Sequence, residues 1–437
     1  MSRGGTDDTA TAKRPFDPVH SIFEERESNV RSYCRAFPTL FTTAKGSLLN
    51  DADGRSFIDF LSGAGALNYG HNHDALQAAL IDYVSRDGVS HALDLHTEAK
   101  EAFLEAFTER ILEPRGLPHK VQFTGPTGAN AVEVALKIAR KATGRTGVLA
   151  FMGGYHGHSM GSLAATANLE HRAAAGTPLH DVAFLPFASG GPTGEFSCLP
   201  YLKAILSDSH SGVERPAAII LETVQAEGGV NVAPAEWLRE LRGICDEHGI
   251  VLIVDEIQTG CGRTGPFFSF ERAGIVPDVI TLSKSISGFG QPMAVTLLRP
   301  ELDVWKPAEH TGTFRGNNLA FVTATAALQV WQDEAIEQGV RDRADIVHEV
   351  LSRDVQPLHP SIELRGLGLI WGVDTVGIDP SGAFAKKVGQ RCFADGLIIE
   401  RTGRNDTVLK ILPPLTIPEE TLREGLGILA GATAACL

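Results

Sequence analysis

Two charged side chains in the sequence follow apolar runs at equivalent places. In IVLIVDEIQTGCGRTG, which starts at Ile250, five apolar residues lead directly to Asp255. In ITLSKSISGFG, which starts at Ile280, a shorter run leads to Lys284. A buried carboxylate is costly unless it has a cationic partner, and burial gives a lysine amine the lowered pKa that a nucleophile needs. We therefore predict that both side chains contact one bound ligand.

The elements that must position these residues alternate between short β-rich runs and helical segments over about 121–298. The helical segments include 128–144, with apolar residues on one face, and 233–249, with Pro near its start and Gly at its end. Apolar strands between helices predict an α/β fold with a mostly parallel sheet covered on both faces. Ligands of such sheets bind at the carboxyl ends of the strands, where Asp255 and Lys284 are expected. The predicted strands are KVQFTG, TGVLAFMGG, VAFLPF, AAIILETV, IVLIVDE and PDVITLSKSI.

The composition disfavours several classes of partner. The 437 residues include 39 basic and 53 acidic side chains, and the formal net charge of −14 repels nucleic acid and anionic membranes. No apolar run approaches the roughly 18 residues that span a bilayer. The first 18 residues lack the apolar core of a signal peptide, and the six cysteines form no CxxC pair. We therefore predict a cytoplasmic protein that acts on small molecules.

Four motifs resemble those of the class III (ω-) aminotransferases. They are GGYHG, DEIQTGCGRTG, ITLSKSISGFG and HTGTFRGN. The resemblance extends from about Phe23 to the C-terminus, and it implies pyridoxal 5′-phosphate (PLP) as cofactor on the fold-type I scaffold. It also implies a domain organisation. The expected parts are a disordered arm over 1–18, a segment over 19–74 that joins the small domain, a large PLP-binding domain over 75–330 and a C-terminal small α+β domain over 331–437.

The resemblance gives cofactor-binding roles to residues of these motifs. Lys284 is expected to form the covalent bond to PLP and, once released, to move the proton between the substrate carbon and the cofactor. Asp255 pairs with the protonated pyridine nitrogen, which keeps the ring an electron sink. Gln258 donates a hydrogen bond to the phenolic oxygen, and Tyr155 stacks on the ring.

The turn TGPTGANAVE, which starts at Thr124 and runs into a predicted helix, predicts a phosphate site. Backbone amides and the macrodipole at a helix N-terminus bind anions, and Gly128 and Ala129 are the expected donors. In the family that the sequence resembles, a threonine of the neighbouring subunit completes this site, and Thr313 in HTGTFRGN matches that threonine. The resemblance therefore implies at least a homodimer, with Thr313 contributed across the interface.

Two other kinds of cofactor are disfavoured. The segment TGPTGANAVE lacks the GxGxxG fingerprint, which argues against a nicotinamide-dependent dehydrogenase. Alternating histidines in HGH (His156, His158) and GHNH (His71, His73) resemble metal ligands. No cysteine or carboxylate cluster accompanies them in the sequence, so we predict that they are turn residues and that no metal binds.

A third group of residues concerns the substrate. By resemblance, Glu227 in ETVQAEGG is the switch carboxylate of ω-aminotransferases. It pairs with a cation while an ω-amine occupies the site, and it releases that cation to the α-carboxylate of glutamate. In many relatives the cation is an arginine, whereas VLKILPPLTI has Lys410 at the matching position. Lysine offers a point charge where arginine offers a bidentate fork, so recognition changes, and Arg404 is the expected partial substitute.

Segments that are not general to the class give a narrower resemblance, to the diaminobutyrate–2-oxoglutarate aminotransferases. They are ESNVRSYCRAFPTLF, FLSGAGALNYGHN, HTGTFRGNN and GLIIE. The small residues of SGAGALNYG, among them Ser62 and Ala64, are expected to line the substrate entrance and to admit a short amino acid. The implied reaction is a ping-pong transfer of the amino group of L-glutamate to L-aspartate-4-semialdehyde, which yields 2-oxoglutarate and L-2,4-diaminobutyrate.

Other functions stay open at this point. An ornithine, 4-aminobutyrate or lysine ω-aminotransferase would share the motifs, although Lys410 argues against these activities. A mutase or decarboxylase on the same scaffold would bind the cofactor with the same residues. A non-enzymatic PLP-binding regulator would need a DNA-binding domain, and the N-terminal arm is too short to form one. Ectoine, siderophore and diaminopropane synthesis are all pathways that use diaminobutyrate.

Overall fold

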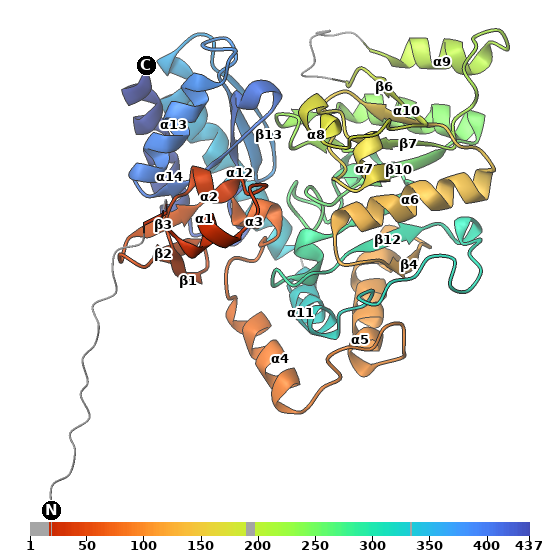
Figure 1. Ribbon diagram of the computed structural model, residues 1–437, viewed down its shortest axis with the longest axis horizontal. Coiled ribbons are helices and arrows are strands. Elements are labelled where there is room, and N and C mark those ends of the chain that lie inside the picture. Colours follow the sequence, from red (N-terminus) through yellow and green to blue (C-terminus); the bar gives the residue numbers. More distant parts are fainter. Residues whose placement is uncertain (1–16, 19, 189–196, 333) are drawn as a thin grey trace, which may run out of the picture.

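A seven-stranded sheet forms the centre of the larger part of the protein (Figure 1). The computed structural model describes residues 17–18, 20–188, 197–332 and 334–437, so all but two residues of the predicted arm over 1–18 lie outside the described residues. In spatial order the strands are β4 (Lys120–Phe123), β12 (Val295–Leu298), β11 (Val279–Leu282), β10 (Val251–Asp255), β7 (Ala218–Leu221), β5 (Val148–Phe151) and β6 (Val182–Leu185).

Most neighbouring strands of this sheet are parallel, which confirms the predicted α/β fold. β10 pairs in parallel with β7 and β11, and β5 pairs in parallel with β6 and β7. All six predicted strands are present. β12 is an additional strand, antiparallel to both β11 and β4.

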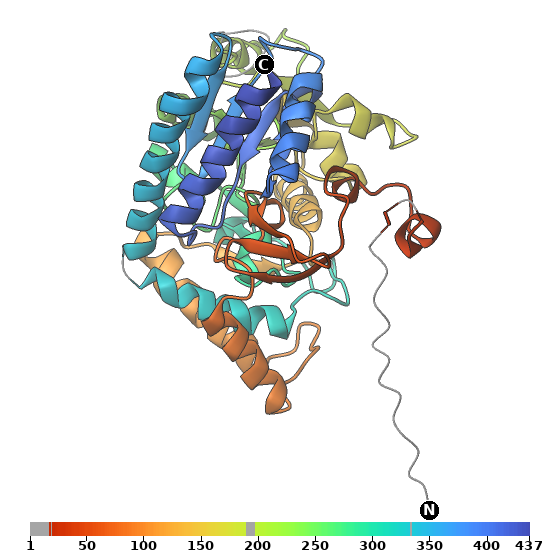
Figure 2. The same cartoon turned by 90° about the vertical axis from the view of Figure 1, so that its left-hand side faces the viewer.

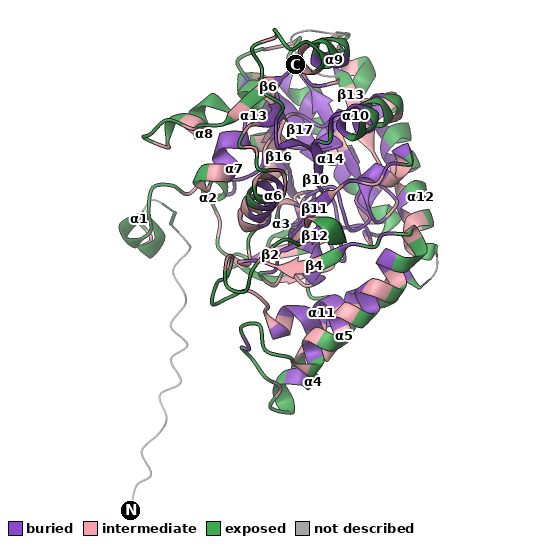
Figure 3. Cartoon of the chain, turned by 90° about the vertical axis from the view of Figure 1, so that its right-hand side faces the viewer, coloured by how far each residue is buried: buried purple, intermediate pink, exposed green. Residues whose placement is uncertain are grey.

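Alternate residues of the central strands enter two separate cores, one on each face of the sheet. Leu252 and Val254 of β10 belong to one core, and Val251 and Ile253 belong to the other. Figure 3 shows the strands of this sheet as buried elements between helices. Such burial on both faces explains why the strands are almost continuously apolar.

The helices of the larger part follow from local sequence signals, as α6 (Gly128–Thr143) illustrates. Thr127 caps its N-terminus by accepting a hydrogen bond from the Asn130 N–H, and Gly144 ends it with a left-handed φ of 69°. None of the described helices is long and apolar enough to cross a bilayer. The other helices are α4 (Asp74–Ser85), α5 (Glu98–Phe107), α7 (Met160–Ala165), α8 (Leu169–Ala173), α9 (Leu199–Ser207), α10 (Ala235–His248) and α11 (Asn318–Leu328).

A smaller part combines segments from both ends of the chain. Its elements are α1 (Ile22–Arg26), α2 (Tyr33–Ala36), β1 (Phe41–Lys45), β2 (Leu48–Asp51), β3 (Ser56–Asp59), α12 (Ala335–Val350), β13 (Glu363–Leu367), β14 (Ile370–Asp374), α13 (Ala383–Ala394), β15 (Leu397–Ile398), β16 (Glu400–Thr402), β17 (Val408–Ile411) and α14 (Glu419–Cys436). β13, β14, β17 and β16 form an antiparallel sheet, and Figure 2 shows α12, α14 and α13 side by side against it. β3 pairs in parallel with β15, so Ile58 lies opposite Leu397. The N-terminal hairpin and the C-terminal segments therefore share one core, to which Ile58 and Phe60 contribute.

Candidate active site

Asp255 ends β10 at the carboxyl edge of the large sheet, and three groups hold its carboxylate. His156 Nδ1 lies 2.8 Å from Asp255 Oδ2, and both side chains are buried. The Thr281 hydroxyl and the Ile257 N–H donate to Oδ1 at 3.0 and 3.1 Å. A carboxylate has about four acceptor sites, so one remains for a further donor. Burial opposes the protonation of His156, but the hydrogen bond and the charge of Asp255 outweigh it and raise the pKa of His156.

Lys284 lies just beyond the end of β11, the strand beside β10, in a 3₁₀ turn over Lys284–Ser287. Its φ of 53° is a left-handed conformation, which is uncommon for residues with a side chain and is found at functional sites. Burial lowers the pKa of the Lys284 amine, while the nearby charge of Glu227 raises it. The charge of Asp255 also acts on this amine. The two predicted residues therefore belong to one site at one edge of the sheet.

Two more strands supply side chains at this edge. Tyr155 follows β5, and its N–H donates to Glu222 Oε2, beyond the end of β7, at 2.9 Å. Burial raises the pKa of Glu222 to about 7, and the charge of Asp255 adds to the rise while that of His156 opposes it. Burial also raises the pKa of Tyr155 to about 12. Four adjacent strands, β11, β10, β7 and β5, thus each place a polar side chain at the same edge.

A left-handed turn, α3 (Ser62–Gly65), is tied to the loops that follow β10 and β11. Its four residues all have positive φ values, of 49°, 60°, 57° and 86°, although two of them are not glycine. The Ala64 carbonyl accepts a hydrogen bond from Gln258 Nε2 at 2.9 Å. The Gly65 carbonyl accepts one from the Ser285 hydroxyl at 2.8 Å. The turn is therefore held in this strained conformation by residues next to the sheet edge.

Five side chains from both parts of the protein, Tyr33, Glu227, Gln258, Glu400 and Lys410, form what we call the ion cluster. Lys410 is fully buried, and its Nζ lies 2.6 Å from Glu227 Oε1 and 2.9 Å from Glu400 Oε2. Gln258 donates to Glu227 Oε1 at 3.2 Å, and Tyr33 donates to Glu400 Oε1 at 2.7 Å. Burial alone would lower the pKa of Lys410, but the two carboxylates raise it above its usual range. Against the effect of burial, the charge of Lys410 lowers the pKa of Glu227.

The N-terminus of α6 lies beside the tip of β10. A Cβ atom at Gly128 would be 2.9 Å from Ile257 Cδ1, so glycine permits this close approach. The first N–H groups of a helix, here those of Gly128 and Ala129, have no partner within the helix and are a ready anion site. The anion site predicted from the sequence is therefore next to the strand that carries Asp255.

Comparison with known proteins places the chain in a family. The family model described as aminotransferase class III matches residues 31–433. The chain belongs to the class III aminotransferases. It is 52% identical to the diaminobutyrate–2-oxoglutarate transaminase of Nocardia farcinica, with 94% of this chain and 93% of the relative covered. It is 54% identical to the enzyme of the same name from Wolinella succinogenes, with 94% and 95% covered.

Solved structures of this family share the fold. An amine transaminase from an uncultivated Pseudomonas species, in its PLP-bound form, matches with a TM-score of 0.85 at 25% identity, with 96% of this chain and 100% of that chain covered. The ornithine aminotransferase of Toxoplasma gondii matches with a TM-score of 0.81 at 26% identity, with 94% and 93% covered. These matches confirm the fold-type I architecture of the aminotransferase.

PLP is the cofactor of this aminotransferase, and the residues at the sheet edge fit it. Asp255 keeps an acceptor site for a pyridine N–H, and the lowered pKa of Lys284 suits an amine that bonds to the cofactor. Gln258 is more constrained than the sequence predicts, since its Nε2 already donates to the Ala64 carbonyl and to Glu227. A hydrogen bond from Gln258 to the phenolic oxygen would replace one of these two bonds.

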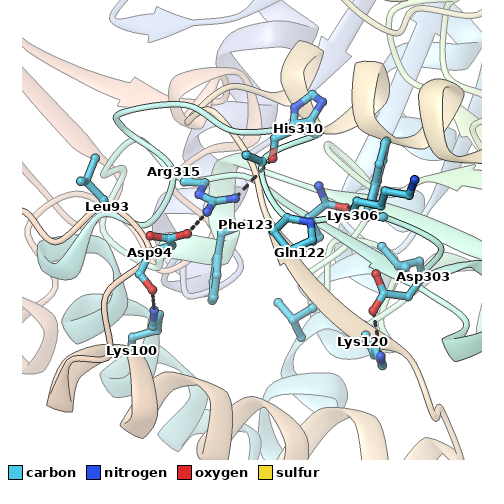
Figure 4. Close-up of a pocket in the computed structure, with 15 residues that line it drawn as sticks. Leu93, Asp94, Lys100, Lys120, Gln122, Phe123, Asp303, Lys306, His310 and Arg315 are labelled. Carbon is cyan, nitrogen blue, oxygen red and sulfur yellow. Dashed lines mark hydrogen bonds and ion pairs between the residues drawn. The ribbon is translucent and has the colours of Figure 1, made fainter.

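Two of the predicted site residues are exposed in the aminotransferase. Thr313 lies on the segment between His310 and Arg315, which line a cavity of about 450 Å³ next to the edge strand β4 (Figure 4). Arg404 lies on the turn between β16 and β17, whereas Lys410 is buried in the ion cluster. The structure brings Lys410 into contact with Glu227, the carboxylate for which the sequence predicts a switch role.

Several residues of the site are missing from the prediction, and three of them show why. The sequence pattern favours a turn role for His156, whereas the structure buries it against Asp255. Its position directly after Tyr155, beyond a predicted strand, is the signal that could have placed it at the sheet edge. Glu400 and Tyr33 carry no such signal, because only strand pairing and chain packing bring them to Lys410. Within the described residues, no group of three or more His, Cys, Asp and Glu is arranged to hold a metal.

Proposed function

We propose that this aminotransferase transfers the amino group of L-glutamate to L-aspartate-4-semialdehyde, which yields 2-oxoglutarate and L-2,4-diaminobutyrate. The main support is that relatives 52% and 54% identical over 94% of the chain both carry the name of this activity. The ion cluster gives physical support, because a fully buried lysine suits a substrate with a carboxylate and a short chain.

The residues at the sheet edge have distinct roles in this proposal. PLP supplies the electron sink that stabilises the carbanion formed when a substrate C–H bond breaks. Asp255 pairs with the pyridine nitrogen, Tyr155 stacks on the ring, and Lys284 holds the cofactor between turnovers. Once released, Lys284 Nζ takes the proton from the substrate carbon that bears the reacting amine. Because burial lowers the pKa of Lys284, more of this amine is neutral and able to accept a proton.

The ion cluster and its neighbours bind the remainder of the substrate. Glu227 pairs with Lys410 while an ω-amino acid is bound, and releases it to the α-carboxylate of glutamate. Ser62 is fully buried with no hydrogen-bond partner for its hydroxyl among the described residues, which supports its role at the substrate entrance. Arg404 acts as a second cation at the mouth, a role supported by the bond from the adjacent Gly403 N–H to the Glu227 carbonyl at 3.1 Å.

A donor and acceptor panel tests the reaction. With 2-oxoglutarate as acceptor, we expect L-2,4-diaminobutyrate to exceed ornithine and 4-aminobutyrate by at least about tenfold in kcat/KM, since recognition of a differently charged or longer chain differs by about 1–3 kcal/mol. This assay runs opposite to the proposed direction, so glutamate should also react with aspartate semialdehyde to give L-2,4-diaminobutyrate. Equal or faster turnover of ornithine would overturn the substrate assignment and leave the aminotransferase class unchanged.

We also infer a homodimer in which Thr313 reaches the phosphate site of the partner. Two exposed apolar side chains support this arrangement. Leu93, which lines the cavity of Figure 4, is 46% exposed in the single chain, and Phe314, next in sequence to the lining residue Arg315, is 66% exposed. We expect Phe314→Glu to shift the protein toward monomers in sedimentation experiments and to weaken PLP binding. We expect Thr313→Ala to weaken PLP binding in a protein that stays dimeric. A fully active monomer would contradict the shared site.

A cytoplasmic location completes the proposal. All six cysteines are free, and five of them are buried. Free thiols persist in reducing compartments, which supports a cytoplasmic setting. Cell fractionation with an antibody against the protein tests this inference.

A further inference from the structure

The distal end of L-2,4-diaminobutyrate carries two opposite charges when its ω-amine reacts. The α-carbon bears a carboxylate and an ammonium group, whereas 4-aminobutyrate has only the carboxylate at that end. A site that prefers diaminobutyrate therefore needs an anion and a cation side by side, because leaving either charge buried without a partner is costly. Lys410 is the cation of the ion cluster. Glu400 is an anion beside Lys410 and has no role in the proposed transfer of the amino group.

The backbone fixes Glu400 and Lys410 relative to each other. The two residues lie directly opposite in the antiparallel pairing of β16 and β17. Glu400 Oε2 is 2.9 Å from Lys410 Nζ, with side-chain exposures of 10% and 0%. At this burial, water screens the two charges weakly. β16 and β17 therefore hold a carboxylate and an ammonium group side by side. This pair is complementary to the ammonium and carboxylate groups on the α-carbon of an amino acid.

Glu400 keeps acceptor capacity for a ligand. Tyr33 donates to its Oε1 at 2.7 Å and Lys410 lies against its Oε2, which leaves about two of the four acceptor sites of the carboxylate. The other carboxylate of the cluster is more fully used. Glu227 already accepts hydrogen bonds from the side chains of Gln258, Thr402 and Lys410.

Glu400 also lies between the interior of the site and its outer side. Glu400 is linked to the loop after β10 through Lys410, whose Nζ lies 2.9 Å from Glu400 Oε2 and 3.4 Å from Gln258 Oε1. The charge of Glu400 also acts on the Lys284 amine. The other neighbour of Glu400, Tyr33, belongs to α2 and is 48% exposed. A substrate whose ω-end reaches toward Lys284 is therefore expected to have its α-carbon near Glu400 and Lys410.

We propose that Glu400 binds the α-ammonium group of L-2,4-diaminobutyrate while Lys410, still paired with Glu227, binds its α-carboxylate with the third of its N–H donors. This inference rests on the proposed function, since it takes diaminobutyrate as the ω-amino acid of the reaction. Tyr33 is a positioning residue, because its hydroxyl fixes Oε1 of Glu400. Glutamate presents no ammonium group at its distal end, so Glu400 pairs with Lys410 alone in that half of the reaction.

The test compares two amino donors that differ only in the α-ammonium group. With 2-oxoglutarate as acceptor, kcat/KM is measured for L-2,4-diaminobutyrate and for 4-aminobutyrate in the wild type and in Glu400→Gln. The substitution keeps the size of the side chain and an acceptor for Tyr33, and it removes the charge. We expect the ratio of the two kcat/KM values to fall at least about tenfold, mainly through the KM of diaminobutyrate, since a charge-assisted hydrogen bond is lost. A ratio within twofold of the wild type would overturn the proposal.

Two further variants separate recognition from structural effects. Tyr33→Phe removes the hydroxyl that positions Glu400, and we expect the same ratio to fall by about two- to fivefold. If Glu400→Gln does not fold, Tyr33→Phe decides the question, and an unchanged ratio then overturns the proposal. Glu363→Gln, an exposed carboxylate of β13 in the same sheet, is the matched control and should leave the ratio unchanged.

The wild-type measurement distinguishes this inference from the proposed function. A wild type that prefers another donor over diaminobutyrate refutes the proposed function itself. A wild type that prefers diaminobutyrate, with a ratio that does not move in Glu400→Gln, refutes only the role of Glu400. In that case Glu400 merely compensates the charge of Lys410, and kcat/KM should fall equally for the two donors.

Discussion

Lys284 and Lys410 are two lysines of one site whose surroundings change their pKa values in opposite directions. Burial lowers the pKa of Lys284, whereas Glu227 and Glu400 raise the pKa of Lys410 in spite of complete burial. The carboxylates lie within 3 Å of Lys410 Nζ, at 2.6 and 2.9 Å. The direct ion pair, rather than burial by itself, therefore decides which lysine keeps its proton.

The opposite pKa shifts of Lys284 and Lys410 agree with the different roles proposed for them. An amine that exchanges a proton with a substrate must be neutral for part of the cycle, and a weakly paired lysine in a dry pocket meets this need. A group that binds carboxylates must stay charged throughout, and a lysine between two carboxylates meets that need. The same residue type thus suits both of the proposed roles, according to the number of carboxylates that touch it.

The largest expected effect comes from removing the first lysine. Lys284→Ala should lower transamination by at least about 10⁴-fold, because one side chain supplies both the covalent attachment and the proton transfer. Absorption spectra and borohydride fixation of PLP measure the loss of attachment. Lys410→Ala, the matched change at the second lysine, should leave the attachment intact. Loss of attachment in both variants would break the comparison.

Removing the second lysine should instead affect stability. Lys410→Met leaves Glu227 and Glu400 without their cation, so we expect the free energy of unfolding to fall by about 3–5 kcal/mol at pH 8. Urea denaturation measures the change, and Lys410→Arg, which retains the charge, is the control. Lys410 lowers the pKa of Glu227 in the folded state, so its contribution is present above the ordinary glutamate pKa and is lost as the pH falls. A variant as stable as the wild type at pH 8 would show that the cluster is not an ion pair.

The charge of Glu227 should raise the pKa of Lys284. In the apoenzyme, the rate of PLP attachment should rise with pH as Lys284 loses its proton, with a midpoint below the ordinary lysine pKa. Because Glu227 raises the pKa of Lys284, Glu227→Gln should move this midpoint to lower pH. Stopped-flow absorption over a pH series gives both midpoints. A midpoint that moves to higher pH would contradict the assigned electrostatics.

The smallest expected effect concerns Glu256, a carboxylate whose pKa, like that of Lys284, is shifted mainly by burial. Glu256 is buried, and the hydrogen bonds to its carboxylate from the described residues come from uncharged groups, the Ser269 and Thr259 hydroxyls and the Phe270 N–H. Burial raises its pKa to about 7, so the stability that the protonated form provides is lost as the pH rises from the ordinary value of 4.5 through 7. Glu256→Gln should therefore add on the order of 1 kcal/mol to the free energy of unfolding at pH 8 and little at pH 4. Urea denaturation at the two pH values checks this, and equal effects at both would refute it.

The sheet edge could be predicted because its residues stand at the end of an apolar run or within a few residues after it. Asp255 and Lys284 are examples, and the confirmed parallel strand order brings such positions together. Local signals also predict α6, whose Thr127 cap and Gly144 end stand in the sequence. The roles of these residues remain predictions, but their arrangement at one edge follows from strand periodicity alone.

The ion cluster could not be predicted from local pattern. Glu400 meets Lys410 through the register of two short strands, and Tyr33 meets Glu400 across 367 residues of chain. The left-handed turn of α3 is a second case, since Ser62 and Ala64 adopt positive φ values that their types disfavour. His156 is a third, because only packing shows that its ring faces Asp255 rather than solvent.

By itself the sequence determined six of the seven strands of the large sheet, two of its helices and the residues at the strand ends, because backbone propensity and apolar periodicity act over a few residues. It also determined the family, through motifs that are contiguous in the chain. Tertiary structure alone decided which charges touch, namely His156 with Asp255 and both carboxylates with Lys410. The physical reason is that burial and ion pairing set the protonation of these groups, and both depend on segments that are adjacent only after folding.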